Sequence, residues 1–267
     1  MDGSAKPNYS IKSVYRALQV LDIFLEAKKP LTLENISRMT KLPKSTTFRL
    51  VTNLVDTEYL EKTNGGYWLS LKLLRFGNLV SDKLDIKILC SPFLEKLHEE
   101  FNETIHFGIL NRDWRIVYLD KIASTQALSV MSSEIGRTAP FHCTGLGKAI
   151  VAHIPEDEVE RYIQNNGLKR YTPKTITDVG KFTKEMRTIR ELGYAFDDSE
   201  HEESIKCIGS PIFDKNNYPV GAISISGPKQ RMDDPQKEFL MKKRLKDYTQ
   251  QISNKMGQEN TPRHPGI

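Results

Sequence analysis

Residues 31–60, LTLENISRMTKLPKSTTFRLVTNLVDTEYL, contain two short helical patterns joined by a tight connection, and they decide the fold of the N-terminal part of the chain. Each pattern carries its apolar side chains along one stripe, as in a helix that packs on a core. The stripes are Leu33, Ile36 and Met39 in the first helix and Thr47, Leu50, Val51 and Leu54 in the second. Pro43 follows the connection, and because a helix tolerates proline in its first turn, we expect the second helix to begin there.

The second helix carries a polar face opposite its apolar stripe. This face and the positions beside it near the helix start comprise Lys44, Ser45, Thr46, Phe48, Arg49 and Thr52. Hydroxyl and guanidinium groups at the leading end of a helix suit the base edges and phosphates of a DNA major groove. The pattern therefore predicts a DNA-recognition helix, with a small helical hairpin and a solvated polar face as the alternative.

Two short β patterns follow the second helix, at residues 59–62 and 67–69. They flank Asn64, Gly65 and Gly66, which favour a hairpin turn because glycine readily adopts positive φ. This hairpin would form the wing of a winged helix-turn-helix domain. Lys62 on the hairpin is a further candidate for DNA contact.

A third helix is expected to precede these elements and to complete the N-terminal core. Ser13 would cap this helix, which would extend to residue 26. Its wide apolar face comprises Val14, Ala17, Leu18, Leu21, Ile23, Phe24 and Leu25. The resulting order of helix, helix, recognition helix and wing predicts a winged helix-turn-helix domain over residues 11–70.

The positive charge of the chain is concentrated in this N-terminal part. Residues 1–80 contain 12 Lys and Arg against 7 Asp and Glu, whereas the remaining 27 Lys and Arg are balanced by 27 Asp and Glu. This asymmetry favours a polyanionic partner such as DNA. The 267 residues allow two domains, and 38% hydrophobic and 27% charged residues are typical of a soluble protein. No apolar run suits a membrane span or a signal peptide, so we expect a cytoplasmic protein without a membrane partner.

Residues 12–70, and above all LPKSTTFRL after a helix ending ISRMTK, resemble the winged helix-turn-helix of the IclR family of bacterial transcription regulators. The resemblance implies that residues 44–52 contact double-stranded operator DNA. Lys41 stands where members of the family commonly have glycine, and a positive φ at this lysine would cost on the order of 1 kcal/mol. Thr47 replaces a more usual aliphatic residue on the buried stripe.

Residues 71–90 are expected to form a helical linker between two domains. The long apolar pattern is interrupted by Gly77 and stops near Ser91, and a separate helix over residues 92–101 would begin with Ser91 as its cap and Pro92 in its first turn. Leucines exposed on such a linker favour self-association. A homodimer, or dimers paired into a tetramer, would suit an operator with two half-sites.

Beyond residue 101 the apolar residues repeat with a period of two, which indicates β-strands. Strands are expected at residues 105–110, 115–121, 127–132, 139–143, 194–197, 205–214 and 219–227, and helices at residues 145–154, 155–165, 179–192 and 234–256. This order predicts an α+β domain and hence an α+β protein of two domains. The resemblance implies a GAF-like effector-binding fold over residues 91–257, an antiparallel sheet with flanking helices. Residues 1–10 are expected to be a flexible arm and residues 258–267 a disordered tail.

A candidate binding pocket lies in the C-terminal domain. Ser224 and Ser226 share one face of a strand, and Thr144 precedes a helix whose first N–H groups suit a carboxylate. Matched position by position, the resemblance implies an effector-binding wall of Gly145, Leu146, Asp197, Cys207, Ser224 and Ser226. These residues favour a small carboxylate or oxo-acid metabolite, with Asp197 accepting a hydrogen bond from a hydroxyl group.

Catalysis is the principal alternative for this domain. TGLGKA at residues 144–149 lacks the first glycine and the Ser or Thr of a phosphate-binding loop. His142, Cys143, His201 and Cys207 could ligate a metal or supply a thiol nucleophile, but none has the short paired spacing of a structural zinc site.

The expected function is a ligand-controlled transcription regulator that is not an enzyme and uses no cofactor or metal. Two rivals remain, a thiol or metal hydrolase with an accessory DNA domain and a DNA-binding structural protein without effector. The resemblance favours repression over activation.

Overall fold

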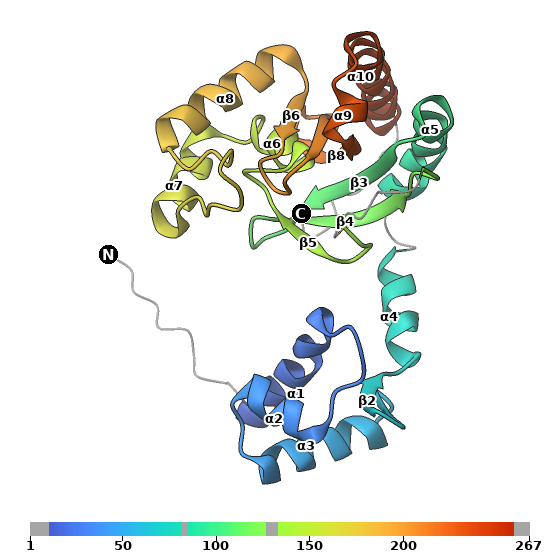
Figure 1. Ribbon diagram of the computed structural model, residues 1–267, viewed down its shortest axis with the longest axis vertical. Coiled ribbons are helices and arrows are strands. Elements are labelled where there is room, and N and C mark those ends of the chain that lie inside the picture. Colours follow the sequence, from blue (N-terminus) through green and yellow to red (C-terminus); the bar gives the residue numbers. More distant parts are fainter. Residues whose placement is uncertain (1–10, 82–84, 127–132, 259–267) are drawn as a thin grey trace. The chain divides into compact units, whose positions relative to one another are not determined.

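The computed structural model describes residues 11–81, 85–126 and 133–258, and the chain divides into two compact units, residues 1–83 and 84–267 (Figure 1). The N-terminal unit is a winged helix-turn-helix. Its elements are α1 (Lys12–Asp22), η1 (Ile23–Glu26), α2 (Leu33–Thr40), α3 (Lys44–Asp56), β1 (Leu60–Thr63), β2 (Gly66–Leu69) and α4 (Lys72–Ser81). The buried core of this unit comprises Val20, Phe24, Leu31, Ile36, Val51, Leu54 and Leu60.

The turn between α2 and α3 has the backbone that the sequence led us to expect. Lys41 ends α2 with a left-handed φ of 56°. Pro43 is the residue that precedes α3, so the helix begins one position later than predicted. Thr47 is fully buried on the inner stripe, and its hydroxyl donates a 3.1 Å hydrogen bond to the carbonyl of Pro43. This bond satisfies the Thr47 hydroxyl group at a buried position where an aliphatic side chain is more usual.

The expectation for the first helix was wrong in its start and in its buried face. Ile11, not Ser13, precedes α1, and the α-helix ends at Asp22 before a short 3₁₀ turn. Val14, Leu18 and Leu25 are exposed, whereas Val20 and Phe24 are buried. A three-helix core of this size covers only one stripe of α1, so the rest of the wide apolar face remains at the surface.

Met39 on α2 is also exposed, against the expectation that it lies on the buried stripe. Thr40, the next residue, is buried in its place, and its hydroxyl donates to the carbonyl of Ile36 at 2.7 Å. At the end of α2 the buried position is therefore Thr40, one residue later than predicted.

The wing is an antiparallel pair in which Leu60 lies opposite Leu69 and Thr63 opposite Gly66. An isolated bridge joins Leu31 to Tyr67 beside it. Gly66 has a φ of +131°, and a Cβ at this position would lie 2.4 Å from the carbonyl oxygen of Leu31. Only glycine fits this close approach, so the wing is pinned to the residue that leads into α2.

The prediction of a helix break near Ser91 was wrong. α4 continues through Gly77, and α5 (Asp85–Phe101) runs through Pro92 without ending. A proline inside a helix removes one backbone hydrogen bond. Phe93, Leu94 and Leu97, which follow it, are buried in the core of the C-terminal unit. Their burial stabilises the helix by more than the lost hydrogen bond costs.

The C-terminal unit is built on a six-stranded antiparallel sheet of order β5-β4-β3-β8-β7-β6. The strands are β3 (Thr104–Leu110), β4 (Arg115–Ile122), β5 (Thr138–Pro140), β6 (Ala195–Asp198), β7 (Ile205–Phe213) and β8 (Pro219–Pro228). The strand expected at residues 127–132 lies outside the described residues. The strand expected at residues 139–143 ends earlier, at Pro140, because the chain turns there into the next helix.

Helices cover both faces of this sheet (Figure 1). One face packs against α5 and α10 (Pro235–Gln258). The other packs against α6 (Gly145–Val151), α7 (Glu156–Asn166) and α8 (Val179–Leu192). A short helix that the sequence did not predict, α9 (Lys229–Met232), follows β8. As predicted, Ile223 and Ile225 face one core, which leaves Ser224 and Ser226 on the opposite face, the side of α6.

Candidate functional site

The outer face of α3 is exposed and carries no acidic side chain before Asp56, at its end. Lys44, Ser45, Phe48, Arg49 and Thr52 are exposed on it, whereas Thr46 is partly buried. The structure thus leaves five of the six candidate side chains on α3 exposed, and the seventh candidate, Lys62, is exposed on β1 of the wing.

Lys44 contacts an acidic side chain. Its Nζ lies 3.1 Å from Oε1 of Glu34 on α2, and both side chains are exposed. An exposed ion pair of this kind is weak, so a phosphate group could replace the carboxylate at small cost.

The second candidate site begins where α6 meets the sheet. Thr144 caps the helix, because its hydroxyl accepts from the N–H of Gly147 at 3.2 Å and donates to the carbonyl of Pro140 at 2.8 Å. Gly145 follows, and a Cβ there would lie 3.3 Å from the Cβ of Cys207. The missing side chain lets the first turn of α6 approach β7 closely.

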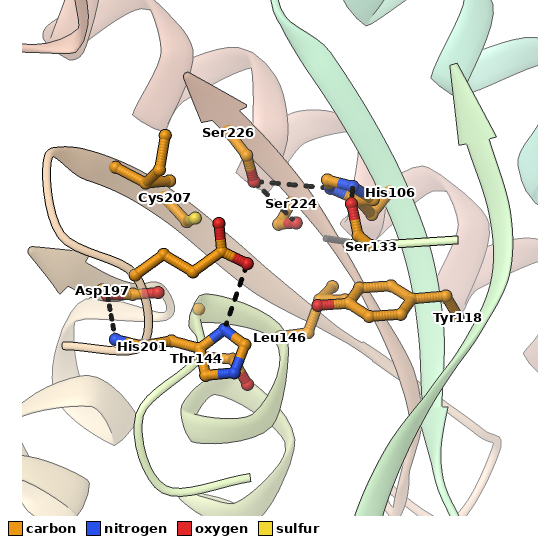
Figure 2. Close-up of a pocket in the computed structure, with 13 residues that line it drawn as sticks. His106, Tyr118, Ser133, Thr144, Leu146, Asp197, His201, Cys207, Ser224 and Ser226 are labelled. Atoms are coloured by element: carbon orange, nitrogen blue, oxygen red, sulfur yellow. Dashed lines mark hydrogen bonds and ion pairs between the residues drawn. The ribbon is translucent and has the colours of Figure 1, made fainter. Parts of the chain in front are cut away.

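All six predicted effector residues line one cavity between α6 and the sheet (Figure 2). Asp197, Cys207 and Ser226 are direct partners across β6, β7 and β8, which puts their side chains on the same face. Ser224 lies two positions before Ser226 on β8, and Gly145 and Leu146 form the opposite wall. Residues from three strands and one helix therefore meet at this cavity.

Sequence reasoning missed several residues of the cavity wall. Those without any assigned role were His106, Tyr118, Ser133, Glu202 and Ile205. His201, considered as a metal ligand or as the partner of a thiol nucleophile, also lines the cavity. His106 and Tyr118 come from β3 and β4, and they reach the site because β4 pairs with β3 and β3 pairs with β8. No local signal in the sequence shows this pairing.

A chain of polar groups runs along one side of the cavity. Nε2 of His106 lies 2.8 Å from the hydroxyl oxygen of Ser133, and Nδ1 lies 3.4 Å from that of Ser226. The hydroxyl oxygens of Ser224 and Ser226 are 3.5 Å apart. Burial, helped by the charge of Lys121, lowers the pKa of His106 to about 3, so the imidazole is neutral at physiological pH.

Asp197 is the buried acid of the cavity. Its Oδ1 accepts from the backbone N–H of Glu200 at 2.8 Å and of His201 at 3.4 Å. Burial raises the pKa of Asp197 to about 7, although these two hydrogen bonds and the charge of Lys148 act in the opposite direction. The carboxyl group is therefore poised between its neutral and charged forms near neutral pH.

The thiol groups are poor candidates for a nucleophile. Burial raises the pKa of Cys207 well above its ordinary value, and the charge of Asp197 raises it further. Cys143 is fully buried, lies outside the cavity lining, and has its pKa raised by the same two causes. Both thiols are thus protonated at physiological pH, which removes the reactive thiolate form.

The four candidate metal ligands do not converge. His201 and Cys207 line the cavity, whereas Nε2 of His142 is hydrogen-bonded at 2.8 Å to the carbonyl of Lys169. Among the residues that the structure describes, no three His, Cys, Asp or Glu side chains are arranged to hold a metal ion.

The buried lysine of α6 is fully committed to partners within the protein. Lys148 is 0% exposed, and its Nζ lies 2.5 Å from Oε1 of Glu200 and 3.1 Å from Oε1 of Glu185. Burial alone would lower its pKa, but these carboxylates reverse the shift and raise it. Lys148 therefore holds α6 to the segment after β6 as a charged group.

An exposed recognition helix and wing, followed by an α+β unit with a polar cavity, define a DNA-binding transcriptional regulator. The family models agree: residues 13–64 match the IclR helix-turn-helix domain, and residues 78–254 match the C-terminal domain of bacterial transcriptional regulator IclR. The chain belongs to the IclR family. Within the described residues no helix is long and apolar enough to cross a membrane.

Individual relatives agree with this assignment. The chain is 33% identical to the HTH-type transcriptional regulator KipR of Bacillus subtilis over 92% of its length and 97% of the relative. It is 30% identical to the transcriptional repressor IclR of Escherichia coli over 84% and 82% of the two chains.

Solved structures share the fold. The IclR of Thermotoga maritima superposes with a TM-score of 0.76 at 29% identity, covering 93% of this chain and 100% of that one. An IclR homologue from Microbacterium hydrocarbonoxydans, solved with 4-hydroxybenzoate, gives a TM-score of 0.79 at 22% identity over 92% and 100% of the two chains.

Proposed function

We propose that this protein is a transcriptional repressor whose binding to operator DNA is controlled by a small organic acid in the C-terminal cavity. The observation that carries the proposal is the convergence of Gly145, Leu146, Asp197, Cys207, Ser224 and Ser226 on one cavity. These residues come from α6, β6, β7 and β8, and the fold brings their polar groups around one cavity.

A carboxylate or oxo-acid effector suits the donors in this cavity. The hydroxyl groups of Ser224 and Ser226 face it from the sheet, and the first turn of α6 faces it at Gly145 and Leu146. Hydroxyl and backbone N–H groups bind oxyanions without a charged partner. The 4-hydroxybenzoate complex of the Microbacterium homologue, a relative in fold, is an example of such an acid bound by a protein of this architecture.

The proposed DNA contacts lie on α3 and the wing. Arg49 and Ser45 would reach base edges, and Lys44 and Lys62 would contact phosphate. Thr46, Phe48 and Thr52 complete the proposed surface. All of these except Thr46 are exposed, so the surface needs no rearrangement of α3 to meet a duplex.

The proposed assembly is a homodimer, which two half-sites of an operator require. Ile11, Val14, Tyr15 and Leu18, at the start of α1, are exposed at i, i+3, i+4 and i+7 and form one apolar stripe. Exposed apolar side chains also lie along α4 and just before it: Leu71, Leu74, Phe76 and Leu79. Apolar stripes of this size on a soluble protein favour a second copy of the chain as partner, and further pairing would give a tetramer.

Control of DNA binding needs an effector that binds two arrangements of the dimer with different affinity, and it needs no turnover. The test is a double variant, Ser224→Ala with Asp197→Ala, assayed on a promoter fragment with and without the acid that most raises the melting temperature of the wild type. We expect the variant to keep its DNA affinity and lose the response to the acid. If the variant still responds to the acid, the effector binds elsewhere in the protein.

A further inference from the structure

Phe48 is an exposed aromatic side chain on the polar outer face of α3. It is 54% exposed, and it lies between Ser45, one turn earlier, and Thr52, one turn later, with Arg49 beside it. These three neighbours are all exposed and polar. Residues three positions before and four positions after a helical residue share its face, so Phe48 stands in the middle of the surface proposed to meet DNA.

The ring of Phe48 has no packing role inside the N-terminal unit. The hydrophobic core of this unit takes Val51 and Leu54 from α3, and the partly buried side chains packed on that core include Leu50 and Val55. Among the residues described in this unit, Phe48 belongs to neither group. Because a phenyl ring is more stable against an apolar surface than in water, the exposed ring is available to a partner that offers an apolar group.

The side chains around Phe48 indicate the kind of partner. The other exposed residues among the first ten of α3 are Lys44, Ser45, Arg49, Thr52 and Asn53. The centre of a protein–protein interface is depleted in charged residues, whereas this face combines two cations with hydroxyl groups. Such groups donate to the phosphates and base edges of DNA. The ring is therefore a single apolar group within a surface that suits a duplex.

The major groove offers a phenyl ring one specific contact. Adenine and guanine present N7 and either an amino group or O6 there, cytosine presents its amino group, and thymine presents O4 and a 5-methyl group. A ring placed on the polar edge of a purine or cytosine would take hydrogen-bonding groups out of water without replacing their bonds, which is unfavourable. The thymine methyl group gains from contact with the ring. Phe48 is the fifth residue of α3, within the part of a recognition helix that reaches base edges.

Building on the proposed binding to operator DNA, we propose that Phe48 selects thymine in each half-site by packing its ring on the 5-methyl group of that base. Phe48 is thus a specificity-determining residue. Its part in recognition depends on the burial of apolar surface, whereas the part proposed for Lys44 and Lys62 depends on charge. Burial of one methyl group corresponds to about a 4-fold gain in affinity, so a dimer on two half-sites gains about 10-fold or more.

Replacement of thymine by uracil tests this contact, because uracil keeps the base pairing and lacks only the methyl group. One fragment of the protein's own promoter region is made in two versions, with dTTP or with dUTP in its place, and each is titrated with the full-length protein. Fluorescence anisotropy gives both affinities at one salt concentration, low enough for every variant to bind measurably. We expect the wild type to bind the thymine fragment about 10-fold or more tightly than the uracil fragment.

Phe48→Ser assigns the effect to the ring. Since Phe48 is exposed, the substitution leaves the buried core of the N-terminal unit intact, which circular dichroism checks. We expect this variant to bind the two fragments within about 2-fold of each other, because serine offers little apolar surface to a methyl group.

Lys62→Ala on the wing is the matched control, since Lys62 is exposed and is proposed to contact phosphate. We expect it to weaken binding to both fragments alike and to keep the wild-type preference for thymine, because a phosphate contact does not sense the base.

Equal affinities of the wild type for the two fragments would overturn the thymine contact, and so would a preference that Phe48→Ser retains in full. Both results leave operator binding in place when the wild type prefers the thymine fragment to a random duplex of equal length at physiological ionic strength. Absence of that preference contradicts operator binding itself.

Discussion

Gly209 on β7 lies directly under Gly145 at the start of α6, so closely that a Cβ on Gly209 would be 2.2 Å from the carbonyl oxygen of Gly145. The contact is between two backbones, and neither can move aside as a flexible side chain would. This pair of glycines fixes the height of α6 above the sheet and thereby the depth of the cavity.

Gly209→Ala should therefore push α6 away from β7 and lower the free energy of unfolding by about 1–3 kcal/mol or more. Urea unfolding monitored by circular dichroism measures the change. Gly77→Ala on α4 is the matched control, because a Cβ there meets nothing within 4 Å. The control substitution should leave the free energy of unfolding unchanged or raise it by up to about 1 kcal/mol, because alanine has a higher helix propensity than glycine. Equal stability of wild type and Gly209→Ala would refute the close packing.

Asp197 should make the stability of the protein depend on pH. Its pKa is raised to about 7 in the folded state, against an ordinary value of 3.8. The folded state therefore holds this proton more tightly than the unfolded chain, so the group stabilises the fold below about pH 4 and loses that contribution as pH rises to about 7.

Asp197→Asn removes this ionisation. Its free energy of unfolding, relative to wild type, should rise between about pH 4 and pH 7, by a few kcal/mol at most. Glu203→Gln should show no such trend, because its side chain is exposed. A difference between Asp197→Asn and wild type that stays constant with pH would mean that Asp197 ionises normally in the folded protein.

Arg49→Ala should weaken binding to the operator by about 1–3 kcal/mol if the guanidinium group reads a base. Fluorescence anisotropy at one fixed salt concentration measures the affinity. Lys28→Ala removes an exposed positive charge outside α3 and serves as the control. An affinity equal to that of wild type would place Arg49 outside the DNA interface.

Leu18→Glu should disrupt the dimer proposed to form through α1. Leu18 is 55% exposed in the single chain, so the substitution leaves the core of the N-terminal unit intact. Light scattering should report a monomer, and operator affinity should fall because two half-sites are no longer bound together. Lys28→Ala provides a control with the same change in charge. A Leu18→Glu protein of wild-type mass would exclude this face as the interface.

Local patterns in the sequence were sufficient to predict the recognition helix and most of the sheet. The inner stripe of α3 follows helical spacing and is buried at Thr47, Val51 and Leu54. The alternation along residues 223–226 likewise separates the two faces of β8. In both cases the spacing of residues close in sequence is enough to predict which side chains are buried.

Features that depend on distant contacts could not be predicted in this way. His106 meets Ser226 across 120 positions of sequence, and nothing near His106 shows that β3 pairs with β8. Pro92 lies inside α5 because tertiary burial of the residues after it outweighs the local tendency of proline to end a helix. The six effector residues were predicted from the family resemblance. A resemblance to proteins of known fold carries information about which strands pair, which local residue patterns lack.

We propose that the exposed face of α3 binds a specific operator. The most direct test is an anisotropy titration of the purified protein with a fragment of its own promoter region and with a random duplex of equal length, at physiological ionic strength. We expect a preference for the promoter fragment of about 1,000-fold or more, lost on addition of the effector acid. Equal affinity for the two duplexes, with and without the candidate acids, would contradict it.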